Sequence, residues 1–404
     1  MKKRSAVLVC PTGGGKTIMG AAMASGHAKN GGRVVWLAHR AELVNQAAKT
    51  FESLGCSVKT IVAGKSTGEG LVTVASIDTV RSWSDLPSAT MVVIDECHHA
   101  RADTWQKLIE RYDLAFRVGL TATPQRHDGR GLGDVFSAIV TACTIKDLTA
   151  GGHLVPCRVF APPQNTEGLA AKPVEAYQTF GNWQSAVLFA TTLEQARTHC
   201  EEFLHAGIAS AVISGEMPMD ERAATLQKFA DGEIGVLCNV AVLTEGWDCP
   251  RASVAIMARG CSHAGLYLQI VGRVLRPAKD KIEARLIDLR GVSFVHGLPD
   301  AERTYSLSDD PILTRAEDVE SITQCQKCGA VFEWAPQCPR CGYCQPPKKR
   351  VIKLTPAEIV ERYAGDSDSQ KTAYRQRLEA IAREKNYRRG WIEHMWRAKY
   401  GDAK

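Results

Sequence analysis

Short apolar runs alternate with longer amphipathic stretches along most of this 404-residue chain. Apolar runs of about four to eight residues predict buried strands, and apolar residues three or four positions apart predict helices. The predicted strands lie at 6–9, 34–37, 71–75, 91–94, 186–190, 209–213, 235–240, 254–258 and 286–289, and the predicted helices lie at 18–27, 41–54, 193–205, 220–230 and in a stretch ending at 275. This alternation predicts two parallel sheets, each covered by helices on both faces.

The stretch 151–172 contains glycines and the prolines Pro156, Pro162 and Pro163, which indicates a joint between the two predicted sheets. We therefore place a first domain at 1–155 and a second domain at 156–305. The cleft between them is the expected place for a ligand.

The composition is that of an ordinary soluble protein, with 45% apolar and 23% charged residues. No apolar run approaches the roughly 20 residues that cross a bilayer, and the run after Met1–Arg4 is too short for a signal peptide. Nine of the fourteen cysteines are scattered singly over residues 10–261, as expected for reduced thiols. We therefore expect a cytoplasmic protein without membrane contact.

A glycine-rich loop follows the first predicted strand, in the segment PTGGGKT at Pro11–Thr17. Glycines let backbone N–H groups point at phosphate oxygens, and the following helix adds the positive end of its dipole. The Lys16 side chain would reach the β- and γ-phosphates, and the Thr17 hydroxyl would bind Mg²⁺. Cys10 stands where the common phosphate-loop pattern has its first glycine. The alternative is a chance glycine loop before a helix.

Two further segments carry the charges that a nucleotide site needs. The strand at 91–94 ends in Asp95 and Glu96, where an Mg²⁺–water network takes an acidic partner. The alternative is an acidic strand end that faces solvent. Far along the chain, the segment QIVGRVLRP at 269–277 carries Arg273 and Arg276, about one helical turn apart. A site built from both ends of the chain would open and close during hydrolysis, as in a motor.

These segments resemble, in order and spacing, the motifs of superfamily 2 helicases and translocases of the DEAD/DEAH type. The chain is most similar to RadD-type bacterial and phage-encoded proteins, which join a helicase core to a cysteine zinc motif and also lack the first glycine of the phosphate loop. Motifs I, Ia, the strand motif after Ia, II, III, IV, V and VI would lie at 11–17, 37–46, 74–80, 95–98, 121–124, 187–196, 240–250 and 269–277. The resemblance implies an α/β fold with two tandem RecA-like parallel-sheet domains of the P-loop NTPase class.

The resemblance also implies roles for individual residues. The catalytic set would be Glu96 as the base, Arg276 as the arginine finger with Arg273 beside it, and Gln269. Nucleotide and Mg²⁺ would be held by Thr12, Gly13, Gly14, Gly15, Lys16, Thr17, Asp95, Gly246 and Asp248, with Thr17 and Asp95 on the metal. His98, Thr121 and Thr123 would couple the nucleotide to the nucleic acid.

Nucleic-acid contacts would come from Arg40, Ser76, Thr191 and Thr244, although each hydroxyl taken alone is an ordinary strand-end cap. The adenine-recognising stretch that family members carry upstream of motif I is not among the nine residues before Cys10. ATP is therefore the expected nucleotide by resemblance alone.

The other five cysteines lie close together near the C-terminus. Cys325, Cys328, Cys338 and Cys341 form the pattern C-x₂-C–x₉–C-x₂-C, and a glycine follows each pair. Four thiolates in two such turns suit a closed tetrahedral zinc site, so we place a zinc ribbon at 320–346. Cys344 could replace Cys341 in a shifted register, and disulfides or an iron–sulfur cluster are the alternatives to zinc.

Positive charge is concentrated in the C-terminal segment, which we place at 347–404. From Lys348 on it holds 15 Lys or Arg and 8 Asp or Glu, a net of +7, whereas the whole chain carries +6. Arginines alternate with Tyr387, Trp391 and Trp396, so cations could bind phosphates while aromatic rings stack on bases. The alternative is a solvated helical face, and the resemblance supports a helical terminus.

Together these features predict an ATP-dependent DNA helicase or translocase in replication, recombination or repair, with ATP, Mg²⁺ and Zn²⁺ as cofactors. Its partner would be nucleic acid, DNA before RNA, and a single-strand-binding or replication and repair protein is a further candidate. Two alternatives stay open. One is a nucleic-acid-stimulated ATPase that remodels protein–nucleic-acid or RNA complexes without separating strands, and the other is a non-enzymatic nucleic-acid-binding module.

Overall fold

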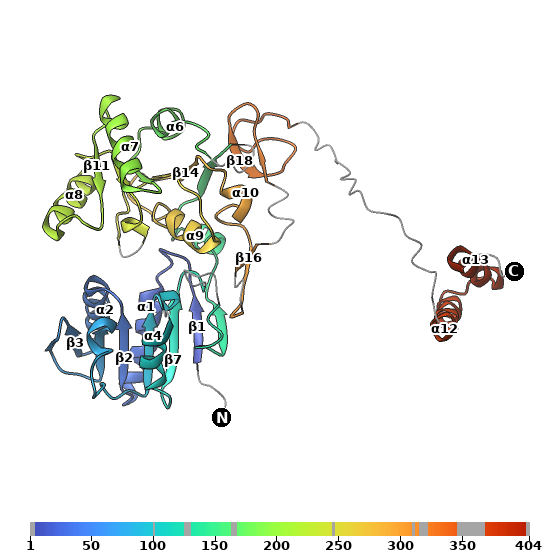
Figure 1. Ribbon diagram of the computed structural model, residues 1–404, viewed down its shortest axis with the longest axis horizontal. Coiled ribbons are helices and arrows are strands. Elements are labelled where there is room, and N and C mark those ends of the chain that lie inside the picture. The colour runs from blue at the N-terminus through green and yellow to red at the C-terminus, as the bar shows by residue number, and fades with distance from the viewer. Residues whose placement is uncertain are drawn as a thin grey trace. The chain divides into compact units, whose positions relative to one another are not determined.

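The computed structural model describes residues 5–99, 102–124, 131–162, 168–244, 247–308, 312–314, 322–345 and 368–400. The chain up to Pro346 forms one unit, and the chain from Pro347 onward forms another. The first unit contains two α/β lobes, drawn from blue to cyan and from green to orange in Figure 1.

The first lobe is built on a sheet that has eight strands in the described residues, in the order β4-β3-β5-β2-β6-β7-β1-β8. Its elements are β1 (Ser5–Val9), α1 (Lys16–Lys29), β2 (Val34–Ala38), α2 (Ala41–Ser53), β3 (Val58–Val62), β4 (Lys65–Thr67), β5 (Val72–Ser76), α3 (Ile77–Val80), β6 (Met91–Asp95), the 3₁₀ turn η1 (Cys97–His99), α4 (Ala102–Glu110), β7 (Phe116–Thr121), β8 (Ala138–Thr141) and α5 (Ile145–Ala150). The strands are parallel except for β4, which pairs antiparallel with β3.

The central strands β2, β5 and β6 are buried at every position, and β2 is also apolar throughout, because both sheet faces are covered. Leu37 of β2 packs in the same apolar cluster as Ile109 of α4. Its neighbour Trp36 points the other way and packs with Ala24 of α1 and Phe51 of α2. Successive side chains of a strand alternate between faces, so a continuous apolar run is what a doubly covered parallel strand requires.

Strand register brings three loop segments to one edge of the first sheet. Val9 at the end of β1 pairs with Thr121 at the end of β7, and Leu120 pairs with Asp95 at the end of β6. The phosphate loop, Thr121 and Asp95 therefore follow the carboxyl ends of neighbouring strands, the usual place for ligands in such sheets.

The second lobe has a sheet with eight strands among the described residues, in the order β11-β12-β10-β13-β14-β9-β18-β17. The elements are β9 (Cys157–Phe160), α6 (Pro173–Phe180), β10 (Ala186–Phe189), α7 (Leu193–His205), β11 (Ser210–Ile213), α8 (Met219–Asp231), β12 (Val236–Asn239), η2 (Val242–Thr244), β13 (Val254–Met257), α9 (Ala264–Gly272), β14 (Ala284–Asp288), α10 (Ser293–His296), β15 (Arg303–Tyr305), β16 (Ile312–Thr314), β17 (Ile322–Gln324) and β18 (Ala330–Glu333). Strands β15 and β16 form a separate two-stranded sheet.

Two features of this lobe go beyond the sequence prediction. The stretch 151–172 is not only a joint, because strand β9 lies within it and pairs in parallel with β14. The cysteine hairpin β17–β18 is not a separate layer, because β18 pairs antiparallel with β9 and extends the sheet. Both depend on pairing partners far away in sequence, which local patterns do not contain.

The chain also returns from the second lobe to the first. The guanidinium of Arg303 donates to carbonyl oxygens around the end of α10, among them those of His296 and Leu298. Four residues later, the carbonyl of Leu307 accepts a hydrogen bond of 2.8 Å from the Gly133 N–H in the first lobe. A second chain crossing thus links the lobes in addition to the joint before β9.

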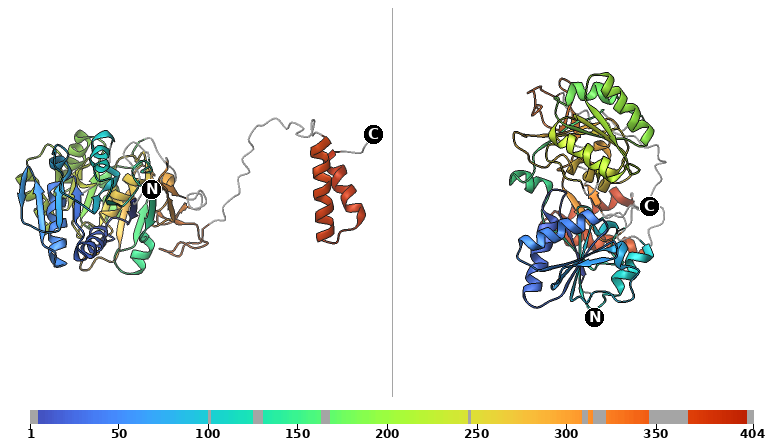
Figure 2. Two further views of the ribbon diagram at one scale, coloured as in Figure 1. Left: turned by 90° about the horizontal axis from the view of Figure 1, so that it is seen from below. Right: turned by 90° about the vertical axis from the view of Figure 1, so that its left-hand side faces the viewer.

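The second unit is a helical hairpin of α12 (Asp368–Glu384) and α13 (Arg389–Tyr400), drawn in red in Figure 2. Leu378 and Ala382 of α12 are buried, which confirms a folded helical terminus. None of the helices that the structure describes is long and apolar enough to span a bilayer.

Candidate nucleotide site and four-cysteine centre

The phosphate loop has a backbone that only glycine suits. Gly13 and Gly15 have φ angles of 86° and 80°, in the left-handed region that side chains disfavour. A Cβ on Gly14 would lie 2.6 Å from the Sγ of Cys10 and 3.0 Å from the carbonyl oxygen of Pro11. The loop therefore presents bare backbone at the N-terminus of α1, which begins at Lys16. This is the geometry in which N–H groups bind phosphate oxygens.

Three charged groups meet beside this loop. The ammonium of Lys16 forms an ion pair with the carboxylate of Glu96, and Asp95 is buried next to them. Burial raises the pKa of Asp95 to about 6, although the charge of Lys16 opposes the shift. A divalent cation at Asp95 would favour the carboxylate and offset the cost of burying it, so the residues present fit a nucleotide with Mg²⁺.

A cleft with about 1120 Å³ of empty volume, partly open to solvent, lies between these groups and the second lobe. The predicted site residues that line it are Thr12, Gly13, Gly15, Lys16, Thr17, Asp95, Glu96, Asp248, Arg273 and Arg276. The two ends of the chain therefore do meet at one cleft. Gly246 lies outside the described residues.

The two motif VI arginines have different surroundings. Arg273 is buried and donates from Nε to the carbonyl of Thr244 at 2.9 Å and from Nη1 to that of Trp247 at 2.8 Å. Arg276 forms an ion pair with Asp248 at the cleft. A Cβ on Gly13 would lie 3.4 Å from the Cγ of Arg276, so this side chain packs directly on the phosphate loop. The Arg276 side chain thus reaches the phosphate loop, and Arg273 holds the carbonyls of Thr244 and Trp247.

A hydrogen-bonded relay connects the lobes through the predicted coupling residues. Gln269 Nε2 of α9 lies 3.2 Å from His98 Nε2, and His98 Nδ1 lies 3.0 Å from the Thr121 hydroxyl. That hydroxyl donates to the carbonyl of Thr123 at 2.6 Å. Because the Gln269 amide donates to Nε2, the ring proton is assigned to Nδ1. The relay thus joins α9 of the second lobe to Thr121 and Thr123 of the first.

Helix α9 approaches the first lobe closely at two glycines. A Cβ on Gly272 would lie 2.6 Å from the Cβ of Thr12, and a Cβ on Gly265 would lie 3.2 Å from the Thr123 hydroxyl oxygen. Neither glycine has a positive φ. Their role is therefore close approach between the lobes, and sequence patterns alone did not identify it.

We expect Gly272→Ala to lower the kcat of ATP hydrolysis about 10²-fold, because displacing α9 by about 1 Å separates Arg276 from the phosphate loop. Steady-state hydrolysis together with thermal unfolding measures the effect and checks the fold. Gly260→Ala is the matched control, since its Cβ would meet only an Arg290 nitrogen at 3.9 Å. An unchanged kcat in Gly272→Ala would show that the lobes need not approach this closely.

The predicted nucleic-acid contacts lie at strand ends in two neighbouring pairs. Arg40 follows β2 and is exposed, and Ser76 ends the adjacent strand β5. Thr191 follows β10 and is exposed. Thr244 follows the adjacent strand β12, but its side chain is buried and donates to the carbonyl of Ala241 at 2.6 Å. The Thr244 hydroxyl therefore caps a turn here, Ser76 is buried as well, and all four contacts stay predictions.

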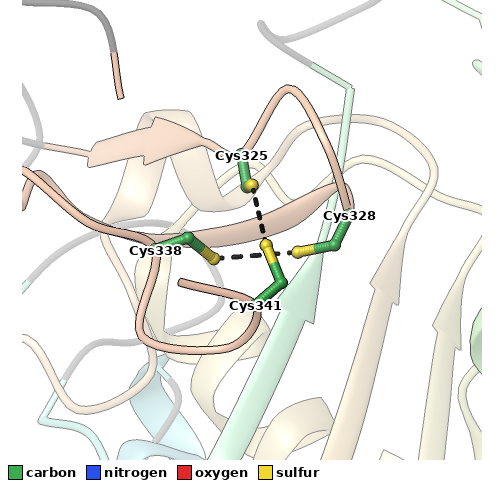
Figure 3. A group of neighbouring side chains, drawn as sticks. All are labelled: Cys325, Cys328, Cys338 and Cys341. Atoms are coloured by element: carbon green, nitrogen blue, oxygen red, sulfur yellow. Dashed lines mark hydrogen bonds between the residues drawn. The ribbon is translucent and has the colours of Figure 1, made fainter. Parts of the chain in front are cut away.

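Four cysteine side chains converge at the end of the second sheet (Figure 3). The Sγ atoms of Cys325 and Cys341 are 3.6 Å apart, those of Cys328 and Cys338 are 3.7 Å apart, and all four lie within 4.8 Å of one another. Four sulfurs at about 2.3 Å from one tetrahedral ion would be about 3.8 Å apart. The cluster thus has the dimensions of a four-thiolate metal site. All fourteen cysteines are free thiols, so the disulfide alternative is wrong.

The register of this cluster is the one predicted, and Cys344 lies outside it, exposed. Burial raises the pKa of Cys325, but the N–H groups of Cys328 and Lys327 and the neighbouring thiols outweigh burial and lower that pKa to about 6. For Cys328, burial and the thiols raise the pKa to about 12. A metal cation bound by these sulfurs would displace the thiol protons.

Some residues of the cleft were missed by sequence reasoning. Gln46, His153, Trp247 and Pro250 also line it. Gln46 and Trp247 lie inside the segments that resemble motifs Ia and V, so the resemblance could have identified them as site residues. His153 lies in the glycine-rich joint and carries no such signal.

Family models match both lobes of the chain. The model described as type III restriction enzyme, res subunit, matches residues 1–126, and the helicase conserved C-terminal domain matches residues 173–278. A solved fragment described as a putative HsdR subunit of a type I restriction enzyme from Vibrio vulnificus YJ016 has the same fold, with a TM-score of 0.58, 20% identity, and coverage of 78% of this chain and 67% of that one.

Curated relatives are similar over much of the chain. A 51.5 kDa protein of a Lactococcus phage is 28% identical over 82% of this chain and 76% of its own length. The putative ATP-dependent helicase IRC3 of Saccharomyces cerevisiae is 24% identical over 78% of this chain but 52% of its own length. The DNA 3'-5' helicase XPB of Kineococcus radiotolerans is 29% identical over 70% of this chain and 56% of its own. With both lobes matched in order, the chain belongs to the superfamily 2 helicases.

Proposed function

We propose that this protein is an ATP-dependent DNA helicase or translocase that acts in replication, recombination or repair. The observation that carries the proposal is the cleft in which Arg276 of the second lobe packs on the phosphate loop of the first. Among the curated relatives named as helicases, XPB is named a DNA helicase, which supports DNA as the substrate. Since this chain spans about half the length of those helicases, the activity is a proposal for this chain itself.

The geometry supports a cycle of closing and opening. Lys16 leaves Glu96 to bind the β- and γ-phosphates, which frees the Glu96 carboxylate to accept a proton from the attacking water. Asp95 and Thr17 would hold Mg²⁺, which would supply positive charge against the negative charge of the phosphates. Arg276 leaves Asp248 for the transferred phosphoryl group. Through the Gln269–His98–Thr121 relay, closing of the cleft would shift the strand ends that bind nucleic acid.

ATP hydrolysis without polymer, and with single-stranded DNA, duplex DNA or RNA, tests the proposal. We expect single-stranded DNA to stimulate hydrolysis, and Lys16→Ala to abolish it under every condition. Separation of a forked duplex distinguishes a helicase from an ATPase that remodels complexes without separating strands. Unchanged turnover in Lys16→Ala, or hydrolysis indifferent to every polymer, would contradict the proposal.

We further propose that the four-cysteine cluster holds structural zinc. All four cysteines come from the β17–β18 hairpin and the loop after it, and β18 pairs with β9 at the edge of the second sheet. The guanidinium of Arg340, between the last two ligands, lies 5.1 Å from the centre of the Phe160 ring. Zinc would thereby hold the edge of the second lobe as well as the hairpin.

The double variant Cys325→Ser, Cys328→Ser should lose about one equivalent of zinc per chain. Metal analysis by mass spectrometry measures it, and the absorption spectrum distinguishes zinc from an iron–sulfur cluster. Cys344→Ser should keep the metal, because Cys344 is outside the cluster. Equal metal content in the wild type, the double variant and Cys344→Ser would contradict the zinc assignment.

A further inference from the structure

The C-terminal hairpin carries a strong positive charge in a small folded unit. Residues 368–400 contain nine Lys or Arg and four Asp or Glu, a net charge of +5. Charge alone does not define a site, because exposed lysines and arginines often only face solvent. The distribution of aromatic rings and ion pairs over the hairpin decides which part is free to bind.

At the open end of the hairpin, the aromatic side chains hold the two helices together. Trp396 of α13 lies 6.4 Å from the ring of Tyr374 on α12 and 4.7 Å from that of Tyr400. Arg375 lies 5.3 Å from the Trp396 ring and donates to Glu393 at 2.9 Å. These groups are engaged in packing between the two helices, and base stacking by Trp396 stays a prediction.

The turn between the helices has a different arrangement. The rings of Tyr387 and Trp391 are 4.7 Å apart, and 45% of Tyr387 is exposed. Tyr387 donates its backbone N–H to the carbonyl of Ala382, and Trp391 donates to that of Arg388, which fixes the turn. An aromatic pair is thus held at the surface by backbone hydrogen bonds.

Cations surround this aromatic pair in sequence and are exposed. Lys385 and Arg388 flank Tyr387, and Arg383 lies in the last turn of α12, which ends at Glu384. Among the side chains that the structure describes in the hairpin, no carboxylate pairs with Lys385 or Arg388. Helix α13 begins at Arg389, so its positive dipole end also lies at the turn.

We infer that the turn at residues 383–391 is a second nucleic-acid-binding site, which binds single-stranded DNA without sequence preference. Lys385 and Arg388 would contact phosphates, and the exposed face of Tyr387, backed by Trp391, would stack on a base. The inference rests on the proposed function, since the helicase core supplies the same strand. A site on a separate unit would raise the local concentration of DNA at the core.

The test uses the full-length protein and a fluorescent single-stranded oligonucleotide without nucleotide, titrated at several salt concentrations. Lys385→Gln with Arg388→Gln should reduce the slope of log affinity against log salt by about 1.4, for two phosphate contacts. Tyr387→Ala should weaken binding about tenfold, and Tyr387→Phe should restore it, because stacking needs only the ring. ATP hydrolysis without DNA should be unchanged in all of them.

Lys371→Gln with Arg377→Gln is the matched control, since it removes the same charge from α12 outside the turn. If this control weakens binding as much as the turn variant, charge alone acts and the site is not at the turn. If the turn variants bind DNA like the wild type, the turn serves another partner, such as an acidic protein segment, and the inference is wrong. Failure of the wild type to bind any polymer would instead contradict the proposed function.

Discussion

Arg276→Ala should lower the kcat of DNA-stimulated ATP hydrolysis by about 10³-fold or more, the range found for arginine fingers. The side chain packs on Gly13 of the phosphate loop and is held by Asp248 at the cleft. The guanidinium of Arg276 would stabilise the negative charge that accumulates on the transferred phosphoryl group in the transition state. Nucleotide affinity should therefore change much less than kcat. Steady-state hydrolysis and binding of a fluorescent nucleotide measure the two effects separately.

Arg197→Ala, an exposed position on α7 of the same lobe, controls for loss of a positive charge. Arg273→Ala should behave differently from Arg276→Ala, because it leaves the buried carbonyls of Thr244 and Trp247 without their donor. It should reduce the free energy of unfolding by about 1–3 kcal/mol for each carbonyl left unpaired. If Arg276→Ala hydrolyses ATP like the Arg197 control, the finger is another residue.

Glu96→Gln should lower kcat by about 10²–10⁴-fold, the usual effect of removing a general base. The amide has nearly the size of the carboxylate but cannot accept the proton of the attacking water. The ion pair with Lys16 is also lost, so Lys16 becomes free to bind phosphate and nucleotide affinity should rise. Single-turnover hydrolysis and nucleotide titration measure these two opposite changes.

The control for Glu96→Gln is Glu69→Gln, which neutralises an exposed acid in the same lobe. Its hydrolysis should match that of the wild type. A Glu96→Gln protein that keeps its kcat would move the role of base elsewhere. A protein that loses nucleotide binding would indicate that Glu96 positions the loop.

Local patterns were sufficient for strands β1, β2, β5, β6 and β10 to β14, but they did not predict β3, β7, β8 or β9. The run from Val34 to Leu37 is apolar because its strand is covered on both faces, and such a run is visible without a structure. The spacing of Cys325, Cys328, Cys338 and Cys341 restricts the cluster in the same way, since two-residue spacers bring paired thiolates together.

Contacts between distant segments were decided only by tertiary structure. No pattern around residues 157–160 shows that β9 will pair with both β14 and β18. Trp396 and Trp391 look alike in sequence, yet one packs inside the hairpin and the other lies at its turn.

The sequence by itself determined which chemical groups this protein carries and which strand or helix presents each one, because periodicity and spacing are local properties. Which of Arg273 and Arg276 reaches the phosphate loop, and which glycines let α9 approach Thr12, depended on how the two lobes pack. The packing of the lobes depends on contacts between residues hundreds of positions apart, and a local sequence pattern carries no information about such contacts.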